Sequence, residues 1–118
     1  MSEISLGNKV FHAASNFILK VYDATREFPK EETFGLTLRL RRAAIDVAAS
    51  VASGISKGKR GAFLSALHTS QSRLDDVSEY LGRSEALGYL SEESNHALLA
   101  ECARIGMCLN ALVERMTG

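Results

Sequence analysis

Histidines with carboxylates near them are the first side chains in this sequence that could do chemistry. Glu93 and His96 stand three residues apart, which is the spacing of one half of a di-iron site in a helical bundle. A complete site needs a second such pair and two further inward carboxylates, and the sequence offers only this one pair. We therefore expect Glu93 and His96 to be solvated side chains, and we predict no metal site and no cofactor.

A second candidate for chemistry is the glycine-rich segment 54–60, which partly resembles a phosphate-binding loop. The segment lacks the Ser or Thr that follows the lysine in that motif, and it follows an expected helix where the motif needs a strand. No Ser, His and acid set, and no Cys and His pair, has the spacing of a nucleophile with its base. The acids Asp75, Asp76 and Glu79 are typical of a solvated helix face. The sequence therefore predicts a protein that is not an enzyme.

The composition is that of an ordinary globular protein, with 46% hydrophobic and 24% charged residues, and fourteen basic side chains balance fourteen acidic ones. A chain of 118 residues has the length of one domain, so we predict a single domain over residues 1–118. The sequence starts without a basic and apolar leader, and no apolar run approaches the roughly 18 residues that span a membrane. We therefore expect a cytoplasmic protein with no membrane partner.

The two cysteines, Cys102 and Cys108, lie six residues apart in an expected helix. That spacing separates them by about 9 Å along the helix axis. A disulfide needs Cα atoms within roughly 7 Å of each other, so the helix excludes a bridge between them. We expect two reduced and buried thiols, which fits a cytosolic protein.

Four stretches have the apolar periodicity of α-helices, with short breaker segments between them. We expect these helices over about residues 9–27, 32–53, 60–87 and from 91 onward, with Gly54 closing the second as a left-handed residue. The fourth stretch has the clearest pattern, a 4-3-4-3-4 seam of Leu98, Cys102, Ile105, Leu109, Leu112 and Met116. The sequence therefore predicts an all-α fold, an antiparallel up-down four-helix bundle.

The second expected helix is apolar almost all round, because only Asp46 and Ser50 are polar between residues 43 and 52. A helix of this kind is buried on more than one side, and in a short chain a second subunit is a natural cover. We therefore predict a homo-oligomer whose interface includes Ala44, Val47, Ala48 and Val51. The alternative is an alanine-rich surface helix, since alanine tolerates exposure and favours helices.

The balanced total charge hides two segregated regions. Residues 39–60 carry six basic side chains against Asp46 alone, and residues 75–101 carry seven acidic ones against Arg83 alone. A basic face of this kind can bind phosphates, especially when symmetry repeats it. We predict that structured RNA or DNA binds through the basic side chains at the two ends of the second helix, Arg41, Arg42, Lys57, Lys59 and Arg60. Arg42 also has the spacing of an ion pair with Asp46.

Several segments resemble the four-helix-bundle proteins encoded in intervening sequences of bacterial 23S ribosomal RNA genes. The most specific part is Phe28-Pro29-Lys30-Glu31-Glu32, followed by paired arginines in Leu40-Arg41-Arg42-Ala43-Ala44. The similarity covers nearly the whole chain and continues through Gly35-Leu36, Val51-Ala52, Gly54, Phe63, Leu67, Leu74, Leu81 and Leu87-Gly88-Tyr89-Leu90.

The resemblance implies a left-turning antiparallel four-helix bundle that assembles as a ring-like homopentamer without enzymatic activity. It also implies a link to nucleic acid, because a related protein, the accessory variability protein of diversity-generating retroelements, is a basic pentamer that binds nucleic acid and a reverse transcriptase. Arg41, Arg42, Lys57 and Arg60 match positions where the family tends to be basic. Ser50 and Ser53 stand where the family usually has Asn and Glu, and Asp76 replaces a glutamate.

Together these observations predict a cytoplasmic, non-enzymatic, homo-oligomeric bundle that binds structured RNA or DNA by phosphate contacts. The alternative is a protein-protein interaction scaffold whose acidic and basic faces recruit protein partners and never touch nucleic acid. The salt dependence of RNA binding separates the two functions.

Overall fold

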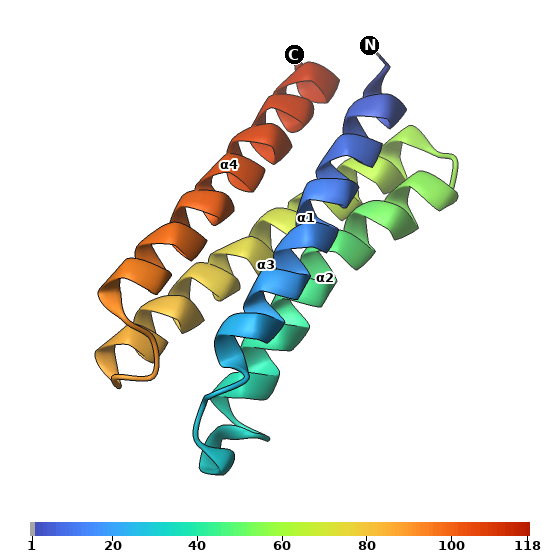
Figure 1. Cartoon of the computed structure of the whole chain (residues 1–118). Helices are drawn as coiled ribbons and strands as arrows, with labels where there is room; N and C mark the ends of the chain where they lie inside the picture. Colours follow the sequence, from blue (N-terminus) through green and yellow to red (C-terminus); the bar gives the residue numbers. More distant parts are fainter. Residues whose placement is uncertain (1) are drawn as a thin grey trace.

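The computed structural model describes residues 2–118, and these residues form four α-helices and one short 3-10 turn without any strand (Figure 1). The elements in order are α1 Glu3–Thr25, η1 Lys30–Glu32, α2 Leu36–Ser56, α3 Arg60–Ala86 and α4 Glu92–Thr117. Each helix packs against the next one along the chain, and α1 also packs against α4. The two ends of the chain lie at the same end of a body measuring 42 × 24 × 18 Å. The predicted all-α class with four helices is confirmed, and a four-helix bundle is consistent with this packing.

Side-chain caps set where the helices begin. α1 begins earlier than residue 9 because the Ser2 hydroxyl accepts a hydrogen bond from the Ser5 amide at 3.1 Å. The Ser91 hydroxyl accepts from the Ser94 amide at 3.0 Å, which confirms the predicted start of α4. α2 begins at Leu36 instead of residue 32, because η1 and Gly35 occupy the intervening residues.

The prediction that Gly54 ends the second helix is wrong. Gly54 lies buried inside α2, which continues to Ser56, and the chain turns at Gly58 with a φ of +67°. A Cβ atom on Gly54 would stand 2.5 Å from the Cβ atom of Ala66 on α3. Gly54 is therefore required for the close approach of two helices, and Gly58 supplies the left-handed turn.

The core lies between all four helices and consists mainly of leucine, valine, alanine and phenylalanine side chains. The predicted apolar seam of α4 is buried along its whole length. The residues predicted as an oligomer interface are also core residues, with exposed fractions of at most 3%: Ala44, Val47, Ala48 and Val51. The structure therefore contradicts that assignment, because side chains already covered by α1 and α3 leave no surface for a second subunit.

The two cysteines are free, and they differ in environment. Cys102 is buried and Cys108 is exposed, so the expectation of a buried thiol is confirmed for Cys102 and wrong for Cys108. Burial disfavours the thiolate and raises the pKa of Cys102 to about 11. Cys102 is therefore a packing residue of the core.

One helix of residues 2–118, α4, is long and apolar enough to cross a membrane by length and composition alone. This is weak evidence for a membrane span, because the core helix of a soluble bundle passes the same test. The seam of α4 from Leu98 to Met116 faces the interior of the chain.

A carboxylate attaches the loop between α3 and α4 to the start of α2. One oxygen of Glu32 accepts a hydrogen bond from the Tyr89 hydroxyl at 3.0 Å, and the other accepts from the Leu36 amide at 3.1 Å. The hydrogen bond to Glu32 raises the pKa of Tyr89 above the ordinary value of about 10. Both oxygens of Glu32 are thus occupied within the chain.

The close approach at Gly54 predicts the effect of adding one methyl group. Gly54→Ala should destabilise the fold by about 1–2 kcal/mol, because the clash with Ala66 outweighs the better helix propensity of alanine. The control is Gly82→Ala in α3, where a Cβ atom meets nothing within 4 Å and a gain of about 0.5–1 kcal/mol is expected. Urea unfolding of both variants measures the difference, and equal effects would contradict the close approach.

The Tyr89–Glu32 hydrogen bond predicts a pH dependence of stability. Because the folded pKa of Tyr89 is raised, the stabilisation is present below pH about 10 and is lost as the pH rises through the folded value. Ultraviolet titration of tyrosinate, with Tyr89→Phe to identify the signal, should show Tyr89 ionising later than free tyrosine. Glu32→Gln should bring its pKa back toward the ordinary value, and an unchanged titration would show that Glu32 does not hold the phenol.

Candidate nucleic-acid interface

The solvent-facing side of α2 carries Arg42 and, directly after the helix, Lys57, which are two of the basic residues that the sequence singled out. Six exposed positions of α2 and of the residue directly after it stand three or four residues apart, which places them on one side: Arg39, Arg42, Asp46, Ala49, Ser53 and Lys57. We call these six residues the α2 stripe. The residues at both ends of the stripe are basic, Ala49 and Ser53 in its middle have small side chains, and Asp46 is its one acid. The ion pairs within residues 2–118 do not include Arg42 with Asp46, so that sequence prediction is wrong and Arg42 is available to a ligand.

Lys57 and Lys59, predicted as phosphate-binding residues, lie in the exposed turn between α2 and α3. Arg60, predicted with them, is engaged inside the chain. Its guanidinium pairs with the Glu3 carboxylate and donates to the Met116 carbonyl at 3.1 Å, so it joins both ends of the chain to α3. The turn therefore offers two lysines to a ligand, and Arg60 serves the fold.

A shallow groove of about 370 Å³ follows α2 next to Lys57, between α2 and α3. Alanines and hydroxyl side chains line it: Ala49, Ser50, Ser53, Ala62, Ser65, Ala66 and Thr69. Small side chains let a sugar-phosphate backbone come close to the helix, and hydroxyl groups donate hydrogen bonds to phosphate oxygens. Ser50 and Ser53 stand where the family that this sequence resembles usually has Asn and Glu. They therefore make this part of the groove wall polar and uncharged.

Arg41 is placed differently from its neighbour Arg42. Its guanidinium carbon lies 4.3 Å from the centre of the Tyr22 ring, and its Nε atom donates to the Thr25 hydroxyl at 2.8 Å. That hydroxyl donates in turn to the Val21 carbonyl at 2.8 Å. The sequence prediction therefore combined two different arginines, a fixed one beside α1 and a free one on the α2 stripe.

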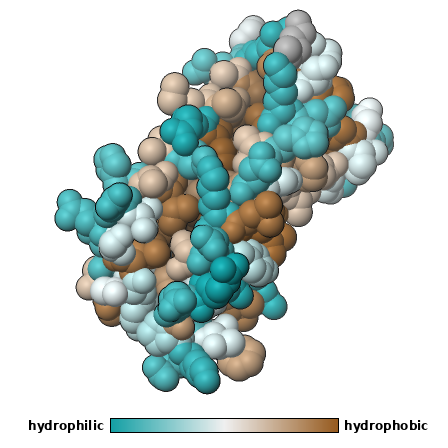
Figure 2. Space-filling view, viewed as in Figure 1, coloured by the Kyte–Doolittle hydropathy of each residue, from teal (hydrophilic) through white to brown (hydrophobic). Residues whose placement is uncertain are grey.

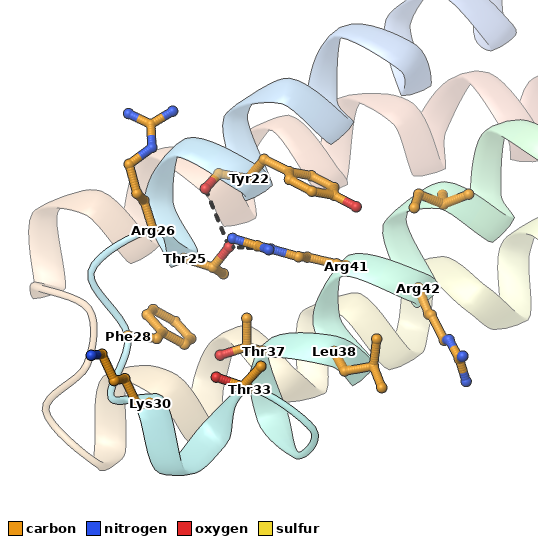
Figure 3. A pocket seen from close by; sticks show the side chains of 11 residues that line it. Tyr22, Thr25, Arg26, Phe28, Lys30, Thr33, Thr37, Leu38, Arg41 and Arg42 are labelled. Atoms are coloured by element: carbon orange, nitrogen blue, oxygen red, sulfur yellow. Dashed lines mark hydrogen bonds between the residues drawn. The ribbon is translucent and has the colours of Figure 1, made fainter.

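The fixed arginine belongs to a pocket of about 480 Å³ where the end of α1, the turn after it and the start of α2 meet (Figure 3). We call it the end pocket. Four basic residues are among the eleven that line it, and none of the eleven is acidic: Tyr22, Thr25, Arg26, Phe28, Lys30, Thr33, Thr37, Leu38, Arg41, Arg42 and Ile45. In Figure 3 the side chains of Arg26 and Arg42 extend outward at opposite edges, whereas Arg41 lies along Tyr22.

Thr37 is the one lining residue of the end pocket with an unused buried polar atom. The residue is 7% exposed, and its hydroxyl oxygen has no hydrogen-bond partner among residues 2–118. No pattern in the sequence indicates this pocket or its residues Arg26, Lys30 and Thr37. The pocket depends on how the turn around Pro29 folds back over α2, and no local spacing signals such a contact.

The acidic residues of α3 and α4 occupy other parts of the surface, and several have partners. Asp76 lies 3.4 Å from Arg73, Glu79 pairs with Arg83, and Glu101 lies 2.6 Å from Lys20. Within residues 2–118, no group of three or more His, Cys, Asp or Glu side chains could hold a metal ion. Part of the negative charge of α3 and α4 is therefore balanced locally.

An apolar groove of about 620 Å³ lies between α1 and α4, and no residue of α2 lines it. It is lined largely by Leu6, Val10, Ala13, Ile105, Cys108, Ala111 and Leu112. Figure 2 shows apolar surface exposed along the face where α1 and α4 lie. Most of the residues that line this groove are apolar, which makes it a candidate contact surface for another protein chain.

Comparison with known proteins identifies the fold and the family. A crystal structure of a protein with unknown function from the S23 ribosomal protein family of Bacteroides thetaiotaomicron is similar, with a TM-score of 0.84 and 13% identity. The similarity covers 92% of this chain and 98% of that one, and at this identity it concerns the fold alone. No curated protein matches the chain. The sequence pattern described as 23S rRNA-intervening sequence protein matches residues 7–111, so the chain belongs to the 23S rRNA-intervening sequence protein family.

Proposed function

We propose that this protein is a non-enzymatic, homo-oligomeric bundle that binds structured RNA or DNA in the cytoplasm through phosphate contacts. The observation that carries the proposal is the α2 stripe. Its basic ends form no ion pairs within residues 2–118, and Ala49 and Ser53 in its middle have small side chains. Arg42 and Lys57 on the stripe, together with Lys59, are the expected phosphate-binding residues. Arg60 is excluded from this set because it binds Glu3 and the Met116 carbonyl, and Arg41 is excluded because it lines the end pocket.

The length of the α2 stripe suits a nucleic-acid backbone. Arg42 and Lys57 are fifteen residues apart, which is about 22 Å along the helix. One strand of duplex DNA places a phosphate about every 3.4 Å of axis, so both ends of the stripe can contact one duplex at once. Contacts of this kind position a partner without specifying its sequence, and they weaken steeply as salt is added.

The family description supports a nucleic-acid partner, because it names an intervening sequence of 23S rRNA. The similar crystal structure is described as a protein of unknown function from a family named after a ribosomal protein. These names suggest a nucleic-acid context, and the cations of the α2 stripe that form no ion pair are the groups that would bind phosphate.

Self-association would multiply the weak contacts of one chain. We propose that the helices run up and down in turn, and that the apolar α1–α4 groove replaces the buried α2 residues as the interface of a ring-like assembly. The groove lies on α1 and α4, so a contact made through the groove does not itself cover the α2 stripe of the same chain. Repeating the stripe around a ring raises the effective concentration of cations near one nucleic acid.

A protein-interaction scaffold is the alternative function. Several acids on α3 and α4 form no ion pair within residues 2–118, such as Asp75, Glu92 and Glu93. They favour this function, because an acidic face can recruit a basic protein. In that case the α2 stripe would contact acidic protein surfaces.

Removing the two basic ends of the α2 stripe tests the nucleic-acid function. Arg42→Ala combined with Lys57→Ala should weaken binding of a structured ribosomal RNA fragment and lower the slope of log affinity against log salt by about 2. The measurement is fluorescence anisotropy at several salt concentrations. The matched control is Arg73→Ala with Arg83→Ala, which removes two cations already paired on α3 and should leave the slope unchanged.

Two results would contradict the proposal. One is the absence of RNA binding at low salt by folded, wild-type protein, which would favour the scaffold. The other is an equal loss of affinity in both double variants, which would mean that total charge matters and the position of the α2 stripe does not.

A bulky charge in the α1–α4 groove tests the proposed interface. Ala13→Arg should lower the mass of the assembly measured by light scattering, because the exposed Ala13 lines the groove. Ala97→Arg is the control, since Ala97 is exposed on α4 outside the residues that line the groove. A wild-type protein with the mass of one chain, or equal effects of both substitutions, would refute this interface.

A further inference from the structure

We propose that the end pocket binds a phosphate monoester, the terminal phosphate of a nucleotide, and that Arg41 and Thr37 are its specific ligands. This deepens the proposed function, and it rests on that function only for the source of the phosphate. The end of a nucleic-acid strand and a free nucleoside monophosphate carry the same group.

The charge of the end pocket selects an anion. Arg26, Lys30, Arg41 and Arg42 line it, and no acid does. Arg26 forms an ion pair with Asp23 at 3.1 Å, which lowers its contribution to the positive charge of the pocket. Glu32 lies at the start of α2, and both of its oxygens already accept hydrogen bonds from Tyr89 and Leu36. A local excess of positive charge therefore remains around Lys30, Arg41 and Arg42.

Arg41 is held ready to bind an oxyanion. Its Nε atom is used by Thr25 and one face of its guanidinium lies on Tyr22, which fixes the plane of the group. Its two Nη atoms have no hydrogen-bond partner among residues 2–118. A planar guanidinium with both Nη groups free matches two phosphate oxygens at once, and fixing it beforehand lowers the entropic cost of binding.

Thr37 is an independent sign of a missing partner. A buried hydroxyl without a hydrogen bond costs free energy, and native proteins seldom keep one. The hydroxyl oxygens of Thr37 and Thr33 lie on the side of the pocket where Phe28 and Lys30 are drawn in Figure 3. Because Thr37 lines the end pocket, a phosphate oxygen bound there would supply the hydrogen-bond partner that this hydroxyl lacks.

The shape of the end pocket favours a monoester over a diester. Its walls come from α1, from the turn around Phe28 and from the first turns of α2, so the site lies at one end of the bundle. A diester must bring two ester links through the mouth of a pocket, whereas a terminal phosphate needs only one. A monoester also offers three free oxygens and close to two negative charges at neutral pH.

The rim of the end pocket provides a contact for the group that carries the phosphate. Tyr22 and Ile45 are partly exposed there, with exposed fractions of 38% and 37%. A ring and an aliphatic side chain at the mouth of a cationic site suit a nucleoside better than a free phosphate ion. We therefore expect a nucleoside monophosphate to bind more tightly than inorganic phosphate.

The test compares one oligoribonucleotide with a 5′-phosphate and with a 5′-hydroxyl, using the full-length protein and fluorescence anisotropy. The phosphorylated form should bind about tenfold more tightly, because charge-assisted hydrogen bonds to the terminal group are added. Thr37→Val and Arg41→Lys should each remove most of this difference. Arg41→Lys keeps the charge, so a loss in that variant reports geometry. Lys57→Ala is the control, which should weaken both oligonucleotides and keep the difference.

A second measurement distinguishes the sources of the phosphate and checks the fold. Adenosine monophosphate and inorganic phosphate are titrated separately by calorimetry. Binding of adenosine monophosphate without binding of RNA would support the end pocket and refute the proposed nucleic-acid function. Equal affinity for both oligonucleotides, with no heat from adenosine monophosphate, would overturn the end pocket as a phosphate site and leave the α2 stripe standing. Thr37→Val should not lower the melting temperature, and a marked drop would show that the hydroxyl serves the fold instead.

Discussion

The packing of α2 on two sides at once is the constraint on which the other features depend. α1 covers one side and α3 the other, and Gly54 lets the backbone of α2 approach Ala66 at a distance that any side chain would prevent. The Ser70 hydroxyl on α3 donates to the Val47 carbonyl of α2 at 2.8 Å, so the two helices also share a buried hydrogen bond. Because the two covered sides take most of the circumference, the exposed side of α2 is narrow. It consists of the α2 stripe together with Ile45 and Ser56, and the stripe carries Arg39 and Arg42.

The sequence predicted the fold where a helix has one buried side and failed where it has two. The seam of α4 repeats at 4-3-4-3-4 spacing, and that pattern has one structural solution. The apolar pattern of α2 has two, because a second subunit and a second helix of the same chain hide side chains equally well. Ala44 and Val47 were therefore placed at an interface when the chain itself covers them. The early start of α1 was missed because its signal is a single cap, Ser2.

The candidate site also has a part that the sequence could predict and a part that it could not. The basic residues of α2 and of the following turn could be found from charge alone, since exposure follows from helix spacing. The engagement of Arg60 could not, because its partner Glu3 lies 57 residues away in the sequence. The end pocket could not be found either, since Arg26, Lys30 and Arg41 come from three segments that meet only when the chain turns at Pro29. Local spacing describes one helix at a time, and both features join separate elements.

The zero net charge does not decide what this protein binds. At physiological salt a charge is screened beyond roughly 8 Å, so an anion responds to the side chains near it and hardly to the total. Asp76 and Glu79 form ion pairs with basic side chains of α3, whereas Arg42 and Lys57 form no ion pair within residues 2–118. A neutral total still has a consequence, because the long-range attraction that gathers anions around a basic protein is missing. On the proposed phosphate-binding function, selection among anions then depends on short-range geometry, and the guanidinium of Arg41, held between Tyr22 and Thr25, supplies such a geometry.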